Sequence, residues 1–160
     1  MTTYDHAHDR SLFLSPAQRE LLDAVVDRVI PPGDGVSGAV EIGVAEHVEG
    51  VCGVSPQTRA LLTNGLKAIE ATSGRTLSKE FVGLTDREKI EVLEQVESRQ
   101  AEFFSLLVRE TYSGYYSSPK VLRAKGLPLS APQPEGYEIE PFDDSLLAGV
   151  RKRGKAYRDA

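Results

Sequence analysis

Residues 15–33 read SPAQRELLDAVVDRVIPPG, and this stretch alone predicts one complete helix. Ser15, Pro16 and Gln18 form a helix start: the serine oxygen can accept from a free backbone N–H, proline loses no donor there, and glutamine can reach back. The Pro-Pro-Gly sequence at the other end must stop the helix. Between these signals apolar residues recur in pairs four apart and line one helical face: Leu21, Leu22, Val25, Val26, Val29 and Ile30.

Similar signals downstream predict four more helical segments, which begin near residues 39, 55, 85 and 101. We expect the second segment to end near residue 49 and the third near Gly74. The fifth could continue the fourth through a bend near Ser98. The expected inner faces of the second, third and fourth segments are Val40, Val44, Val48 and Val51, then Leu61, Leu62, Leu66 and Ile69, then Ile90, Leu93 and Val96.

The pattern changes after the fifth segment. Gly114 interrupts the helical period, so residues 115–119 are expected to form an aromatic loop, and Pro119 should keep any helix from crossing that point. Four prolines between residues 126 and 141 favour an extended segment, and a short helix is expected at about residues 143–153.

No alternating pattern persists long enough to build a sheet. The sequence therefore predicts an all-α fold: a compact bundle of about five helices with an extended proline-rich C-terminal segment and a short terminal helix. Its expected divisions are a flexible lead-in at residues 1–12, a helical domain at 13–125 and a partner-binding segment at 126–160.

Composition narrows the classes of partner. A formal net charge of -5 provides no positive field for nucleic acid. No apolar run approaches the roughly 20 residues of a membrane helix, so direct membrane insertion is not expected. The first ten residues hold neither twin arginines nor an apolar stretch, from which we expect a cytoplasmic protein.

Counting reactive residue types predicts no catalytic, cofactor-binding or metal-binding residues in this chain. Of three histidines, His6 and His8 fall in the lead-in, and His47 is expected on a helix surface. Cys52 is the sole cysteine and is expected to be a small buried hydrophobe rather than a nucleophile. One weaker hypothesis makes the chain an enzyme with Glu46, His47 and Glu49 as its polar centre.

Aromatic residues cluster between residues 103 and 116, where core packing and an interface explain them equally well. Tyrosine combines an apolar ring with a hydrogen-bonding tip, which suits an interface. The proline-rich segment has few apolar groups, so ordering on a partner would explain it. The candidate partner-binding residues are Phe104, Tyr112, Tyr115, Tyr116, Pro134, Tyr137 and Phe142.

Several short sequences, in order and at their spacing, resemble the gluconate 2-dehydrogenase subunit 3 family. They are residues 27–32 (DRVIPP), Gly38-Ala39, Gly43-Val44, Phe81, Leu84, Phe103-Phe104, Thr111, Gly114-Tyr115-Tyr116, Pro119 and residues 134–137 (PEGY).

The resemblance implies a non-catalytic small subunit that assists folding, maturation or export of a large glucose-methanol-choline type dehydrogenase. In such systems the large subunit holds FAD and oxidises a sugar or polyol, and a cytochrome c subunit can take the electrons. Many members bear a twin-arginine signal; without one, periplasmic or secreted placement would require export with a signal-bearing partner. The alternative function is a stand-alone helical interaction or regulatory module with no link to a flavoenzyme.

Overall fold

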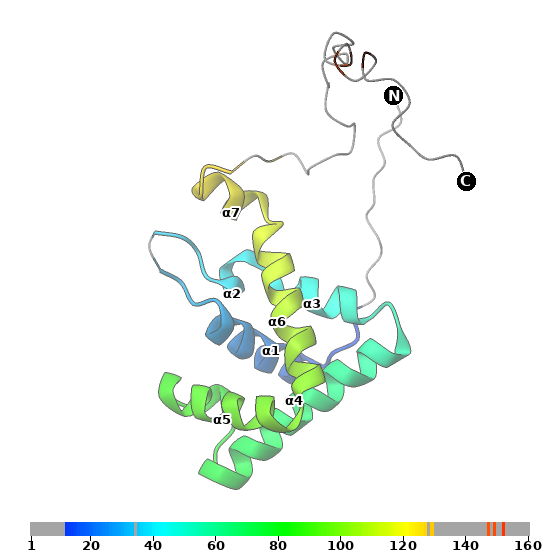
Figure 1. Ribbon diagram of the computed structural model, residues 1–160. Coiled ribbons are helices and arrows are strands. Elements are labelled where there is room, and N and C mark those ends of the chain that lie inside the picture. The colour runs from blue at the N-terminus through cyan, green and yellow to red at the C-terminus, as the bar shows by residue number, and fades with distance from the viewer. Residues whose placement is uncertain are drawn as a thin grey trace, which may run out of the picture. The chain divides into compact units, whose positions relative to one another are not determined.

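The computed structural model describes residues 12–33 and 35–127, together with residues 129, 147, 149 and 152. This described part is helical, and its only strand-like pairing is an isolated bridge between Gly33 and Val36. The all-α prediction is confirmed (Figure 1). In chain order the elements are α1 (Pro16–Val29), α2 (Ala39–Ile42), α3 (Val44–Cys52), α4 (Pro56–Leu77), the 3-10 turn η1 (Phe81–Gly83), α5 (Asp86–Arg99), α6 (Ala101–Tyr116) and α7 (Pro119–Ala124).

The chain divides into two compact units, Met1–Leu129 and Ser130–Ala160. All of the helices named above belong to the first unit. In the second, only Leu147, Gly149 and Lys152 are described, and each has helical geometry. The extended segment and most of the terminal helix expected from the sequence therefore lie outside the described residues, and the three expected divisions of the chain stay predictions.

Local hydrogen bonding starts two helices as the sequence predicted. At α1 the Ser15 hydroxyl accepts from the Gln18 N–H at 3.3 Å, and the Ser15 N–H donates to the Gln18 side chain at 3.0 Å. Thr85 and Glu88 repeat this reciprocal cap at α5, where the Thr85 N–H donates to Glu88 at 2.8 Å. Such a cap is worth about 1 kcal/mol. Both helices thus begin at the residues that the sequence indicated.

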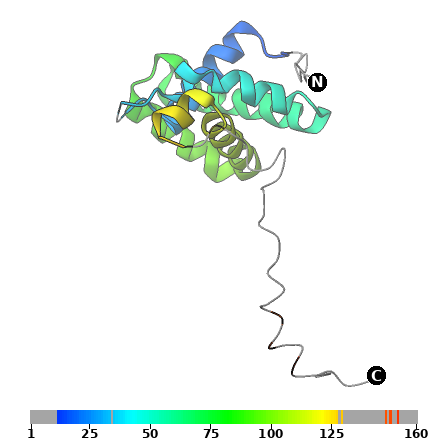
Figure 2. The ribbon, with the colours of Figure 1, turned by 90° about the horizontal axis from the view of Figure 1, so that it is seen from above.

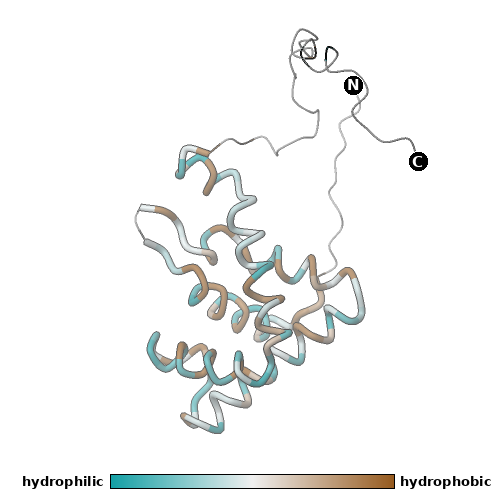
Figure 3. The backbone as a smooth tube through the Cα atoms, viewed as in Figure 1, coloured by the Kyte–Doolittle hydropathy of each residue, from teal (hydrophilic) through white to brown (hydrophobic). Residues whose placement is uncertain are grey.

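Helix α6 is the centre of the bundle and packs against α1, α2, α3, α4, α5 and α7. Figure 2 looks down on the bundle, roughly along this helix. Two glycines allow the close approach: a Cβ on Gly65 of α4 would lie 2.1 Å from the Phe103 ring, and one on Gly114 would lie 2.7 Å from His47 of α3. Hydrophobic residues gather along the chain where the helices meet, whereas α4 and α5 also carry many hydrophilic residues (Figure 3).

Glu49 is a buried residue of α3 that connects this helix to the segment preceding α1. Its side chain is fully buried, and one carboxylate oxygen accepts from the backbone N–H groups of Phe13 at 2.5 Å and Leu14 at 2.6 Å. The other oxygen forms an ion pair with Arg19. A buried charge is tolerable only when it is paired and hydrogen-bonded in this way. Glu49 therefore has an architectural role.

The prediction of one continuous second helix that ends near residue 49 is wrong in two respects. Gly43 divides it into α2 and α3, because the residue takes φ 79°, a left-handed conformation that glycine adopts without strain. Helix α3 then runs on to Cys52. Val44 and Val48 are buried as predicted, but the break turns Val40 outward to 41% exposure.

The predicted end of the third helix at Gly74 is also wrong. Helix α4 continues to Leu77, and Ser78 ends it at φ 55°. The bend near Ser98 is replaced by a complete break at Gln100, with φ −135° and ψ 53°, so α5 and α6 are separate helices. The buried residues of α5 are Val92, Leu93 and Val96.

The expected aromatic loop does not exist, because α6 continues through Gly114 to Tyr116. Gly114 gives the helix room beside His47 rather than ending it. The expectation about Pro119 is correct: no helix crosses this residue, and it starts α7, a short helix that the sequence did not indicate. Phe81 and Leu84 are buried and anchor the connection between α4 and α5.

Replacing Glu49 with alanine should lower the free energy of unfolding by about 2–4 kcal/mol, because two N–H groups and Arg19 lose their partner. Urea unfolding followed by circular dichroism measures the change. Glu46→Ala is the control on the same helix, since Glu46 is exposed and its replacement should cost at most about 0.5 kcal/mol. Equal effects of the two substitutions would contradict the role assigned to Glu49.

Two glycines of α4 should respond to alanine with opposite signs. Gly74→Ala should stabilise the protein by about 0.5–1 kcal/mol through helix propensity, because nothing lies within 4 Å of the added Cβ. Gly65→Ala should destabilise it by about 1–3 kcal/mol, because the buried Phe103 ring occupies that space. Thermal unfolding of both variants tests the pair, and stabilisation by Gly65→Ala would refute the close packing of α4 and α6.

Candidate functional site

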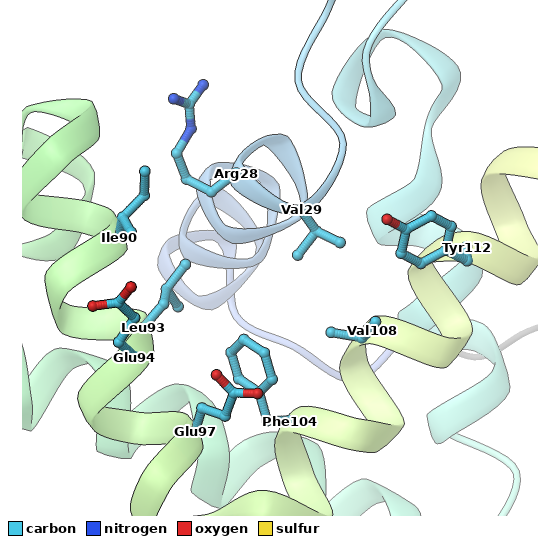
Figure 4. Close-up of a pocket in the computed structure, with 9 residues that line it drawn as sticks. All are labelled: Arg28, Val29, Ile90, Leu93, Glu94, Glu97, Phe104, Val108 and Tyr112. Atoms are coloured by element: carbon cyan, nitrogen blue, oxygen red, sulfur yellow. The ribbon is translucent and has the colours of Figure 1, made fainter.

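A groove of about 260 Å³ opens between α1, α5 and α6 (Figure 4). Helices α5 and α6 form its two walls because they separate at Gln100, and the C-terminal end of α1 lies between them. Most of the lining is apolar. The lining residues are Arg28 and Val29 from α1, Ile90, Leu93, Glu94 and Glu97 from α5, and Phe104, Val108 and Tyr112 from α6.

The α6 wall belongs to a longer apolar stripe. Phe104, Val108, Tyr112 and Tyr116 follow one another at four-residue intervals, so they lie along one face of the helix. The first two are half-buried, whereas Tyr112 and Tyr116 are each 44% exposed. The two tyrosine rings stack with their centres 6.0 Å apart and an angle of 12° between their planes. We call these four residues the α6 stripe.

The α5 wall combines one exposed apolar residue with two carboxylates. Ile90 was predicted to belong to the core, but it is 48% exposed, and Val92 is buried instead. Glu94 and Glu97 are exposed at the same edge of the groove. Neither forms an ion pair with any residue in the described part of the chain.

Arg28, the cation that lines the groove, is already paired. Its guanidinium contacts the carboxylates of Asp27 at 2.5 Å and Asp86 at 2.7 Å, and the side chain is largely buried. The hydrogen bond to Asp27, assisted by the charges of Asp27 and Asp86, raises the pKa of Arg28 above its usual value. Two carboxylates thus balance one guanidinium, and Arg28 leaves little positive charge to offset Glu94 and Glu97.

The structure separates the predicted partner-binding residues into three groups. Phe104, Tyr112 and Tyr116 lie together on the α6 stripe. Tyr115 is buried in the core, where its hydroxyl donates to the Ser37 carbonyl at 2.8 Å and its ring meets Tyr116 edge to face at 5.2 Å. Burial raises the pKa of Tyr115. Pro134, Tyr137 and Phe142 lie outside the described residues.

Sequence reasoning missed Ile90, Glu94, Glu97 and Arg28 as residues of a surface site. Val108 was missed as well. The available signal was the spacing of Phe104, Val108, Tyr112 and Tyr116, which marks a second apolar face beside the buried one. The α5 residues had no comparable signal, because their position follows from the break at Gln100.

The three residues that the enzyme hypothesis proposed as a polar centre, Glu46, His47 and Glu49, lie in different environments. Glu46 is exposed, His47 packs against Gly114, and the Glu49 carboxylate is bound to Arg19 and two backbone N–H groups. Cys52 is fully buried, as predicted. Burial, reinforced by the charge of Glu110, raises the pKa of its thiol to about 11.

No three or more His, Cys, Asp and Glu side chains among the described residues are grouped so that they could hold a metal ion. None of the described helices combines the length and apolar character needed to cross a membrane. The groove, at about 260 Å³, lies just below the roughly 300–1,000 Å³ of ordinary small-molecule and cofactor sites.

Comparison with known proteins gives one match. The family model of gluconate 2-dehydrogenase subunit 3 matches residues 16–128, well over half of the chain, and this range contains every helix from α1 to α7. No curated protein and no solved structure matches the chain. The chain therefore belongs to the gluconate 2-dehydrogenase subunit 3 family.

Proposed function

We propose that this chain is a non-catalytic small subunit that binds a large FAD-dependent dehydrogenase of the glucose-methanol-choline type. The partner would oxidise a sugar, glycoside or polyol, and this chain would support its folding, maturation or export. Membership of the family indicates a multi-subunit enzyme. The observation that carries the proposal is the groove with its adjoining stripe, because this surface has the character of a protein interface.

Three properties of the surface support protein binding. Its aromatic residues are held by rigid helices, so little side-chain freedom is lost on contact. Tyrosine is enriched among residues that dominate binding energy. The stacked pair of Tyr112 and Tyr116 continues the apolar lining of the groove beyond its mouth, which enlarges the area that a partner could cover.

The surface also suits a supporting role. The helices behind it are fixed by the buried face of α6, so it is preformed before a partner arrives. A preformed apolar face can cover apolar surface of a larger chain that would otherwise be exposed to water during assembly. In this proposal FAD and the redox chemistry belong to the large subunit, and electron transfer passes to a further subunit such as a cytochrome c.

The proposal predicts that charge placed on the stripe breaks the complex. Tyr112→Asp/Tyr116→Asp should weaken binding of the flavoprotein by about 2 kcal/mol or more, roughly thirtyfold in Kd. The chain would be co-expressed with a flavoprotein dehydrogenase encoded beside it, and the complex measured by pull-down and size-exclusion chromatography. Circular dichroism of each isolated chain checks that the helices persist.

The matched control is Leu12→Asp/Val54→Asp. Both residues are exposed and apolar, and neither lines the groove. This variant should retain the complex. If the tyrosine variant bound the flavoprotein as tightly as the wild-type chain does, the interface would have to lie elsewhere than on the α6 stripe. A wild-type chain that stays monomeric beside the flavoprotein would overturn the proposed function and favour a stand-alone interaction module.

A further inference from the structure

Two unpaired carboxylates stand beside the apolar lining of the groove. Glu94 and Glu97 are three residues apart on α5, so they project from one face of the helix. Figure 4 shows both carboxylates on the α5 side, in the part of the groove that Leu93 and Phe104 also line. An apolar partner that covered this region would have to remove water from negative charge, which is costly without a compensating cation.

The cation that lines the groove is already paired with other acids. Arg28 contacts Asp27 and Asp86. On the exposed side of α5, Arg87 pairs with Glu91 at 3.0 Å. Glu94 and Glu97 have no ion-pair partner in the described part of the chain. The groove therefore presents net negative charge at its α5 edge.

Positive charge lies at the Tyr116 end of the α6 stripe, whereas Glu94 and Glu97 lie in the groove with Phe104 at its other end. The ammonium of Lys125, just beyond α7, lies 5.9 Å from the centre of the Tyr116 ring. From Phe104 to Tyr116 the stripe extends for roughly 18 Å at 1.5 Å per residue, which is about three turns of a partner helix. An amphipathic helix docks in such grooves through apolar residues at i, i+3 or i+4, and i+7.

We infer that the groove binds a helix of the partner subunit that presents large apolar side chains and, next to them, a lysine or arginine. The apolar side chains enter between α5 and α6, and the cation pairs with Glu94 and Glu97. The inference rests on the proposed function and adds the chemistry of the segment that is recognised. A helix without this cation is rejected, because it would leave both carboxylates desolvated and unpaired.

Reversing the two charges tests the inference. Glu94→Lys/Glu97→Lys should weaken the purified complex with the flavoprotein at least tenfold at low salt, because like charges then face each other. The control Glu41→Lys/Glu46→Lys makes the same change in net charge at exposed residues of α2 and α3 that do not line the groove. It should change Kd by less than about twofold. Titration of the isolated chain into the flavoprotein subunit gives each value.

A neutral variant separates charge from helix stability. Glu94→Gln/Glu97→Gln preserves size and helix propensity, and it should weaken binding severalfold and reduce the dependence of Kd on salt. Hydrogen exchange in the wild-type complex should show new protection in α5 and α6. Unchanged affinity and salt dependence in both groove variants would overturn the inference while leaving the proposed function intact, and so would an equal loss in the α2 and α3 control. Failure of the wild-type chain to bind the flavoprotein overturns the proposed function itself.

Discussion

The structure depends on how closely α6 approaches its neighbours. Glycine at position 65 makes space for the Phe103 ring, and glycine at position 114 makes space for His47, so α6 lies close to α4 at one end and to α3 at the other. Between these two points α6 buries Leu107 and Thr111. Because the rotation of the helix is fixed by this buried face, the remaining face has no freedom in where it points. The α6 stripe is therefore a consequence of core packing as much as of surface composition.

The groove arises from the same constraint and from the break at Gln100. If α5 and α6 formed one continuous helix, no wedge could open between them, and Ile90 and Tyr112 would lie far apart along a single rod. The break instead lets α5 pack on α4 while α6 crosses α3 and α4, and the end of α1 fills the space between. The ion pairs from Arg28 to Asp27 and Asp86 connect this end to the start of α5. Scaffold and candidate site are built from the same contacts.

How far the sequence could predict this arrangement depended on the range of the interaction. The caps of α1 and α5 were predictable because serine or threonine and its partner lie three residues apart. Gly114 was misread because a glycine that serves a helix contact and one that ends a helix look the same in sequence. At the site, the four-residue spacing of Tyr112 and Tyr116 could have indicated a shared helical face, but reading Gly114 as a helix end placed Tyr116 in a loop. The burial of Tyr115 did not, because its hydroxyl partner is Ser37, 78 residues away.

The residues that carry the family resemblance mostly determine geometry. A Cβ on Gly38 would collide with Pro32 at 2.7 Å, so this glycine lets the chain turn closely after α1, and Tyr115 ties the same turn to α6. Phe104 and Tyr116 contribute to both the quoted motifs and the stripe, whereas Glu94 and Glu97 lie within the matched range but are exposed and are not among those motifs. The charges at the groove could therefore be changed without disturbing the packing that orients α6. Under the proposed function, this separation would let one helical scaffold present different charge patterns to different partner subunits, because affinity would come from the apolar stripe and selectivity from the α5 edge.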